Sequence, residues 1–236
     1  MNLLLLNDSD FIAPGRVVVS DRRFLQLRDV IKLEKGKTLR AGLVGGALGR
    51  AQVIDFTGEH AELSVTLDTP PPEPCAVTLV CALPRPQTFH KVLHCAVTMG
   101  VKTIWFIHSR KVEKSYWSAS VLDDAAVDRE IRLALEQCGD TVYPRLFFRD
   151  RFKPFAEDEL PGLISAADGA LFGHPRAEAR PEGFAGRRMV LLVGPEGGFS
   201  DYEVEKLTSA GATAVTLGSR VLRTEFAVAA LLAKLS

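Results

Sequence analysis

The sequence lacks the features that define several large classes of protein. It has four cysteines, Cys75, Cys81, Cys95 and Cys138, with no C-x-x-C pair, which indicates reduced core thiols rather than a disulfide framework. No apolar run approaches the roughly 18 residues that a membrane span needs. The opening Met1–Leu6 has no basic region and stops at Asn7 and Asp8. We therefore expect a cytoplasmic protein with no membrane segment.

The sequence also lacks an excess of either charge. Lys and Arg number 29, and so do Asp and Glu, so no overall field draws the protein to nucleic acid or to a membrane. Division near Pro74 reveals no hidden basic half. Contacts with nucleic acid must therefore come from local patches.

Residues 70–74 contain four prolines, which exclude the interior of a helix or a sheet from this segment. We place the boundary between two domains here, residues 1–73 and 74–236. The first part has short strand-like runs divided by glycine-containing turns, and one short helical segment. Strands are predicted at 16–20, 38–44, 51–56 and 60–67, and a helix at 22–30. This pattern predicts a small β-barrel.

The second part alternates apolar strands with helices, which indicates an α/β domain with a largely parallel sheet. Strands are expected at 76–83, 103–108, 142–148, 169–173 and 189–194, and helices at 88–99 and 123–138. In such sheets ligands bind at the carboxyl ends of the strands.

The segment Arg188–Ser200 predicts a ligand-binding turn. A strand runs directly into Gly194, Gly197 and Gly198, which allow a ligand to approach the backbone closely. Ser200 and Glu203 then form the capping box of a helix. The Lys-Ser/Thr of a phosphate-binding loop and the G-x-G-x-x-G of a dinucleotide fold are both missing. A small-molecule site is therefore predicted, with a purely structural turn as the alternative.

A further strand ends near Val215–Gly218 and leads through residues 219–225 into the apolar segment Phe226–Leu235. Since this last segment is apolar on nearly every face except at Lys234, it predicts a buried terminal helix.

The residues just described carry a specific resemblance. Gly194–Ser200 together with Leu217–Glu225 resembles the paired signature of the bacterial 16S ribosomal RNA uracil-N3 methyltransferases of the SPOUT superfamily. The segments Leu171–Ala177, Glu136–Gly139 and Arg28–Gly36 are similar to further, looser motifs of the same family. The resemblance spans nearly the whole chain and is sharpest after residue 170.

The resemblance implies an α/β fold with a C-terminal SPOUT trefoil-knot domain and an N-terminal PUA-like β-barrel. It also implies a homodimer that acts on 16S rRNA or the small ribosomal subunit, with S-adenosylmethionine as cofactor and no metal. The cofactor residues that it implies are Leu171, Phe172, Gly173, His174, Gly194, Pro195, Glu196, Gly197, Gly198, Leu217, Gly218, Val221, Leu222 and Arg223.

Two residues are the candidates for chemistry. Methylation of uracil N3 removes a proton from an imide. Glu196 is a candidate to hold the cofactor or accept that proton, and Arg223 to stabilise negative charge on the uracil oxygens. The alternative roles are capping of backbone amides by Glu196, and binding of an RNA phosphate or the dimer partner by Arg223.

Other residues are candidates for RNA binding. The arginines and lysine expected near the barrel form either an RNA track or an ordinary exposed face: Arg16, Arg22, Arg23, Arg28 and Lys32. The mixed basic and aromatic loop with Lys111, Lys114, Tyr116 and Trp117 suits either a clamp for RNA bases or a solvated loop. His90 and His94 have the spacing of a zinc pair but no third ligand, which favours a packed or surface pair.

Met99 and Asp140 depart from the pattern of the family. They leave open a SPOUT methyltransferase with another RNA target. A second alternative is a non-catalytic protein that binds RNA or assists ribosome assembly. A nucleotide-dependent α/β enzyme is a third alternative, which the missing phosphate-loop residues disfavour.

Overall fold

The structure is a computed structural model, and it describes residues 2–236. The chain forms two compact units. The first comprises Met1–Glu73 and Arg132–Tyr143, and the second comprises Pro74–Ile131 and Pro144–Ser236. Residues 132–143 thus cluster with the N-terminal part of the chain rather than with the sequence around them. The domain division at Pro74 stays a prediction.

The first unit contains a six-stranded sheet in the order β1-β4-β5-β6-β3-β2, in which the β1–β4 pair is parallel and the other pairs are antiparallel. The strands are β1 (Leu4–Leu6), β2 (Phe11–Ala13), β3 (Arg16–Val19), β4 (Thr38–Leu43), β5 (Leu48–Phe56) and β6 (Ala61–Thr69). A short 3₁₀ turn, η1 (Asp8–Asp10), and helix α1 (Arg22–Asp29) complete it.

The core of this unit follows from the period of two in its strands. In β6, Ala61, Leu63 and Val65 are buried and alternate with more exposed residues, so one face of the strand lies in the core. Helix α1 packs Phe24 and Leu27 into the same cluster. The sequence predicted α1, β3, β4, β5 and β6 near these positions, but β1 and β2 were missed.

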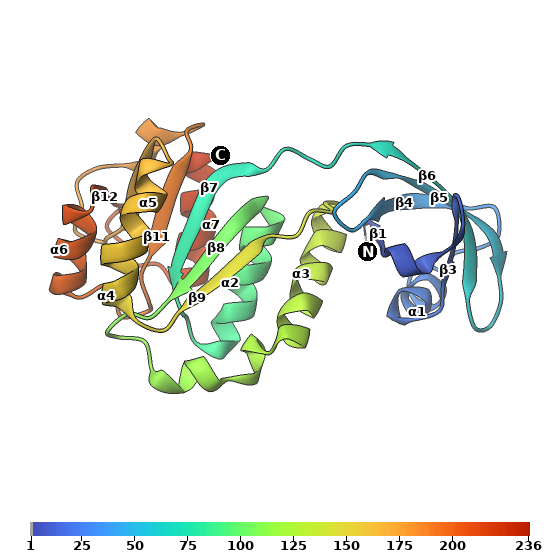
Figure 1. Ribbon diagram of the computed structural model, residues 1–236, viewed down its shortest axis with the longest axis horizontal. Coiled ribbons are helices and arrows are strands. Elements are labelled where there is room, and N and C mark those ends of the chain that lie inside the picture. Colours follow the sequence, from blue (N-terminus) through green and yellow to red (C-terminus); the bar gives the residue numbers. More distant parts are fainter. Residues whose placement is uncertain (1) are drawn as a thin grey trace. The chain divides into compact units, whose positions relative to one another are not determined.

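The second unit has a six-stranded, fully parallel sheet in the order β12-β10-β11-β7-β8-β9 (Figure 1). The strands are β7 (Cys75–Ala82), β8 (Val101–Ile107), β9 (Arg145–Arg149), β10 (Gly169–Gly173), β11 (Met189–Val193) and β12 (Ala212–Val215). All of them lie within a few residues of a predicted strand, which confirms the predicted parallel sheet.

Helices cover both faces of this sheet (Figure 1). They are α2 (Pro86–Thr98), α4 (Phe152–Pro154), α5 (Leu160–Ser165), α6 (Asp201–Ser209) and α7 (Thr224–Leu235), with the π-helical turn η4 (Phe155–Glu159) between α4 and α5. Helix α3 (Asp124–Cys138) begins in this unit, and its residues from Arg132 onward belong to the first unit. The 3₁₀ turns are η2 (Lys114–Ser118), η3 (Ser120–Leu122) and η5 (Pro181–Phe184). Helices α2 and α7 pack against each other on one face, and α4–α5 cover the other.

The sequence missed the helical segment 152–165 altogether. This segment places Phe152, Phe155 and Leu160 against Trp105 and Phe172 on one face of the sheet. Pro154, Pro161 and Gly162 interrupt the segment, and these residue types usually indicate a loop. Burial of the aromatic side chains outweighs that local preference.

Helix α7 corrects one expectation. Val228, Leu231, Leu232 and Leu235 are buried, but the Phe226 side chain is 58% exposed. One stripe of the helix therefore lies in the core rather than its whole circumference. No helix among residues 2–236 is long and apolar enough to cross a membrane.

Candidate functional site

A cavity of about 280 Å³ lies where three neighbouring strands end. Strands β12, β10 and β11 are adjacent and parallel, so their carboxyl ends meet at one edge of the sheet. The loops that follow them, together with α7, form the walls. Open α/β sheets bind ligands at such edges.

Most of the residues expected to bind a cofactor line this cavity. Those that do are Gly173, His174, Gly194, Pro195, Glu196, Gly197, Gly198, Leu217, Gly218, Val221 and Leu222. The lining also includes residues that the sequence reasoning did not select: Pro175, Val193, Val215, Thr216, Arg220, Thr224, Ala227 and Leu231.

Three expected residues do not line the cavity. Leu171 and Phe172 lie within β10 with fully buried side chains, and Phe172 packs in the core beside the sheet. The family motif at this position therefore includes residues of the strand as well as residues of the loop that follows it. Arg223 is exposed at the N-terminus of α7, outside the cavity lining.

The loop after β11 depends on its glycines for close packing. A Cβ on Gly194 would lie 3.1 Å from the backbone nitrogen of Phe199, so a side chain there would crowd the turn. Gly198 has a φ of +68°, a conformation that side chains disfavour. At Gly197, the carbonyl oxygen accepts a hydrogen bond from Lys111 Nζ at 2.7 Å. The conformation of the loop therefore depends on its glycines and on the hydrogen bond from Lys111.

Glu203 anchors the end of this loop. Its buried carboxylate accepts a hydrogen bond from Ser200 N at 2.7 Å, and the Ser200 side chain accepts one from the Glu203 backbone, which together form the predicted capping box. Ser200 Oγ also donates to the same carboxylate at 2.9 Å. The carboxylate accepts a further hydrogen bond from the backbone N–H of Arg110 at 2.8 Å. One carboxylate thus joins the N-terminus of α6 to the loop that follows β8.

The loop after β12 is fixed by Thr216. Its backbone N–H donates to the carbonyl oxygen of Ala179 at 2.9 Å, which ties this loop to the one that follows β10. Its Oγ1 accepts from the backbone N–H of Gly218 at 3.2 Å. Gly218 has a φ of +131°, which favours glycine. The two loops therefore form one continuous wall.

Glu196 lies between the cavity and the start of α2. Its Oε1 accepts a hydrogen bond from the backbone N–H of Arg85 at 3.3 Å and lies 3.9 Å from Arg85 Nε. The carboxylate is partly exposed and therefore accessible from the cavity. The backbone contact matches the capping role that the sequence left open for Glu196.

His174 is the titratable group of the cavity whose pKa departs from its usual value. Burial lowers the pKa of His174, the nearby charge of Arg176 lowers it further, and Asp201 opposes both effects. The backbone N–H of Arg176 donates to His174 Nδ1 at 3.3 Å. His174 is therefore held neutral at physiological pH.

The arginines proposed as an RNA track in the first unit have acidic partners. Arg16 pairs with Glu62, Arg22 with Glu136, and Arg28 with Asp29. Lys32 is exposed and has a positive φ of 52°.

Arg23 corrects the expectation of an exposed track. It is buried, bonds Asp10 and Asp21, and donates to the carbonyl oxygen of Leu5 at 2.7 Å. Burial by itself lowers its pKa, but the two carboxylates outweigh burial and raise it. Arg23 therefore stabilises the fold and is not presented to a phosphate.

Two further sequence features have local explanations. His90 and His94 both lie near Glu130, at 3.6 Å and 2.9 Å. No cluster of three or more His, Cys, Asp or Glu side chains suited to a metal occurs within residues 2–236. Trp117 donates its indole N–H to His108 Nδ1 at 2.9 Å.

Comparison with known proteins agrees with this geometry. The chain is 26% identical to the ribosomal RNA small subunit methyltransferase E of Treponema pallidum, over 98% of this chain and 88% of that protein. It is 29% identical to the protein of the same name from Mycobacterium tuberculosis, over 85% of this chain and 78% of that protein.

Solved structures share the fold. A putative methyltransferase from Legionella pneumophila, solved with bound cofactor SAM, has a TM-score of 0.76 at 20% identity and covers 99% of this chain and 96% of its own. A ribosomal RNA small subunit methyltransferase E from Neisseria gonorrhoeae, bound to S-adenosyl methionine, has a TM-score of 0.73 at 22% identity, over 99% and 95%. These likenesses confirm the predicted fold class.

The family assignment rests on the second unit, which contains the parallel sheet and the cavity. The sequence model of the RNA methyltransferase domain matches residues 71–236. This chain therefore belongs to the RNA methyltransferase domain family.

Proposed function

We propose that this protein transfers a methyl group from S-adenosylmethionine to N3 of a uridine in 16S ribosomal RNA, in the cytoplasm. The observation that carries the proposal is the convergence of three strand-end loops on one cavity, lined by the residues that the family resemblance selects. Relatives over most of the chain are named small-subunit rRNA methyltransferases, which supports the choice of RNA.

The residues of the cavity fit S-adenosylmethionine. Val193, Val215 and Leu231 supply apolar walls suited to an adenine ring. The glycines after β11 present backbone amides and carbonyls that can pair with polar edges of a ligand. Neutral His174 adds no positive charge, which suits a cationic sulfonium. When bound, the cofactor supplies an electrophilic methyl group.

Residues of this chain supply the remaining chemistry in the proposal. Glu196 lines the cavity and carries the carboxylate that holds the amino group of the ligand or accepts the imide proton. Arg85 fixes the orientation of this carboxylate through its backbone N–H. Arg223 lies outside the cavity of its own chain, so its guanidinium serves the RNA or the site of a partner subunit.

We propose a homodimer through the surface next to the cavity. The side chains of Val221, Leu222 and Phe226 are 79%, 41% and 58% exposed, which is unusual for neighbouring large apolar residues. All three lie on the loop after β12 and the first turn of α7. A two-fold interface buries such a patch against its own copy.

Calorimetric titration with S-adenosylmethionine and then with S-adenosylhomocysteine tests the proposal. Binding of both ligands with one site per chain is the expected result. Absence of binding to a folded protein would instead favour the non-catalytic alternative, a protein that binds RNA without transferring a methyl group.

A further inference from the structure

Four arginines lie on two loops that border the cavity. The loops after β10 and β12, residues 174–180 and 216–223, contain Arg176, Arg180, Arg220 and Arg223 but a single carboxylate, Glu178. We call these four residues the arginine rim. In a chain whose total charge is zero, this concentration of one sign requires an explanation.

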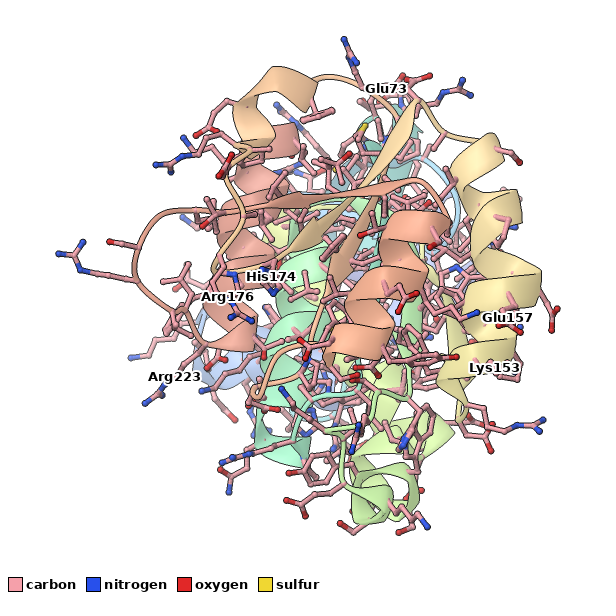
Figure 2. All side chains as sticks on the ribbon, turned by 90° about the vertical axis from the view of Figure 1, so that its left-hand side faces the viewer. Glu73, Lys153, Glu157, His174, Arg176 and Arg223 are labelled. Atoms are coloured by element: carbon pink, nitrogen blue, oxygen red, sulfur yellow. The ribbon has the colours of Figure 1, made fainter. Side chains whose placement is uncertain are left out.

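Three of the rim arginines are tied to the cavity by separate observations, and Arg223 directly precedes the lining residue Thr224. Arg220 is among the lining residues. Arg176 lowers the pKa of His174, which also lines the cavity. Arg180 Nη1 lies 4.0 Å from the Cβ position of Gly218. Figure 2 shows Arg176 and Arg223 left of the centre of the view, with His174 nearer the middle, and Lys153 and Glu157 on the right.

The rim arginines form no ion pair within residues 2–236, and they differ from other unpaired exposed arginines, such as Arg50 and Arg145, in lying together on two adjoining loops. All four are exposed, and within residues 2–236 none of their side chains forms a hydrogen bond or an ion pair. In contrast, Arg16 and Arg28 of the first unit pair with Glu62 and Asp29, and Arg149 of the second unit pairs with Glu159. Neutralised arginines attract a polyanion weakly, whereas unpaired ones keep their full field.

The small ligand does not account for the rim. S-adenosylmethionine carries a sulfonium and an ammonium group against a single carboxylate, so four further cations repel it on balance. Phosphate oxygens, in contrast, are the groups that the planar guanidinium binds with two parallel hydrogen bonds.

We propose that the arginine rim binds the phosphates of single-stranded RNA on both sides of the nucleotide that is methylated. In this proposal the rim, rather than the arginines of the first unit, binds the RNA backbone. The inference rests on the proposed function, because it takes RNA as the substrate. The rim sets the position of the strand beside the cavity that holds the cofactor.

The test replaces Arg176 and Arg180. Both lie on the loop after β10, whereas the proposed dimer patch lies on the loop after β12 and the start of α7. The double variant R176Q/R180Q is compared with R16Q/R28Q, which removes two exposed but neutralised arginines from the first unit. Binding of a short single-stranded RNA of mixed sequence is measured by fluorescence anisotropy at several salt concentrations. Thermal unfolding verifies that both variants are folded.

The expected result is a selective loss of RNA binding. R176Q/R180Q lowers RNA affinity at low salt by roughly tenfold, and the slope of log K against log salt falls by roughly 1.4, or about 0.7 for each phosphate contact. R176K/R180K restores the slope because lysine also binds phosphate as a point charge. R16Q/R28Q behaves like the unmodified protein.

Two results would overturn the inference. One is RNA affinity within twofold of the unmodified protein in folded R176Q/R180Q, and the other is an equal loss in R16Q/R28Q. Titration of the unmodified protein with S-adenosylmethionine separates the two proposals. Absence of cofactor binding contradicts the proposed function alone, because the RNA measurements still decide the role of the rim.

Discussion

The carboxylate of Glu196 accepts a hydrogen bond from the backbone N–H of Arg85, 111 residues earlier in the sequence, at 3.3 Å. This contact joins the loop after β11 to the start of α2. It leaves the second carboxylate oxygen of Glu196 available to a ligand.

The substitution Glu196→Gln separates structure from chemistry. Glutamine keeps an oxygen acceptor for Arg85 N–H but loses the charge. We expect the free energy of unfolding to change by less than about 1 kcal/mol and methyl transfer to fall by about 10- to 100-fold. Urea denaturation and a methyl-transfer assay measure the two effects. Unchanged transfer would remove Glu196 from the proposed chemistry.

His174 predicts a pH dependence of cofactor binding. Burial and Arg176 lower its pKa, so the neutral form persists in the folded protein below the usual value near 6.5. As pH falls through the lowered pKa, an imidazolium forms in the cavity and repels the sulfonium. Affinity for S-adenosylmethionine is therefore expected to fall, whereas affinity for neutral S-adenosylhomocysteine falls less. In His174→Gln this difference between the ligands should disappear; if it persists, another group is responsible.

The lowered pKa of His174 also predicts how the free energy of unfolding changes with pH. Because the pKa is lower in the folded state, the unfolded chain takes up a proton first as pH falls. The contribution of His174 is thus fully present above about pH 6.5 and is lost as pH falls from there through the lowered pKa. Denaturation curves of the unmodified protein and of His174→Gln should diverge in that window. Parallel curves would contradict the prediction.

Substitution of Gly198 tests whether the backbone conformation of the cavity loop is needed for cofactor binding. Its φ of +68° and the open space around its Cβ position predict that Gly198→Ala costs about 1–2 kcal/mol through backbone strain alone. Gly186, with a φ of +72° and similar space, lies outside the cavity lining and is the matched control. Both variants should lose similar stability, but only Gly198→Ala should weaken cofactor binding. Equal affinities in the two variants would contradict this role of the loop.

Substitution of Arg23 tests whether this arginine stabilises the fold rather than binding RNA. Arg23→Met leaves Asp10 and the carbonyl oxygen of Leu5 without their buried partner. We expect a loss of about 3–5 kcal/mol, as for other buried ion pairs broken on one side. Arg28→Met removes an exposed, solvent-screened pair and should change the free energy of unfolding far less. Urea denaturation distinguishes them, and similar small losses would contradict a structural role for Arg23.

The proposed dimer surface gives a further prediction. Phe226→Glu places a charge in the exposed apolar patch beside the cavity. We expect sedimentation velocity to show dissociation to monomers, because burial of an unpaired carboxylate disfavours association. Val30→Glu changes a still more exposed apolar residue of the first unit and should have no effect. A monomeric unmodified protein would contradict the proposed dimer.

The sequence predicted best where a local pattern and the fold agree. β10 occupies the predicted residues 169–173, and Ser200 with Glu203 forms the predicted capping box. Most of the cavity lining was also anticipated, because the motifs that carry the family resemblance lie at the ends of these strands.

The missed features depend on contacts between distant residues. β1 was missed because the run Leu3–Leu6 has no polar alternation; these residues are buried, and β1 pairs with β4 almost forty residues later. Arg23 was taken as exposed because its partners Asp10 and Asp21 become apparent only in the fold. Thr224, the first residue of α7, was overlooked although it is buried and lines the cavity.

The central claim is methyl transfer to a uridine of small-subunit ribosomal RNA, and mapping of the product tests it most directly. Small-subunit RNA is incubated with the protein and isotopically labelled S-adenosylmethionine, and the labelled nucleoside is identified by mass spectrometry. The account predicts label in one nucleoside, a uridine methylated at N3. Label in another nucleoside would contradict the choice of atom, and absence of label from a protein that binds the cofactor and RNA would contradict the claim itself.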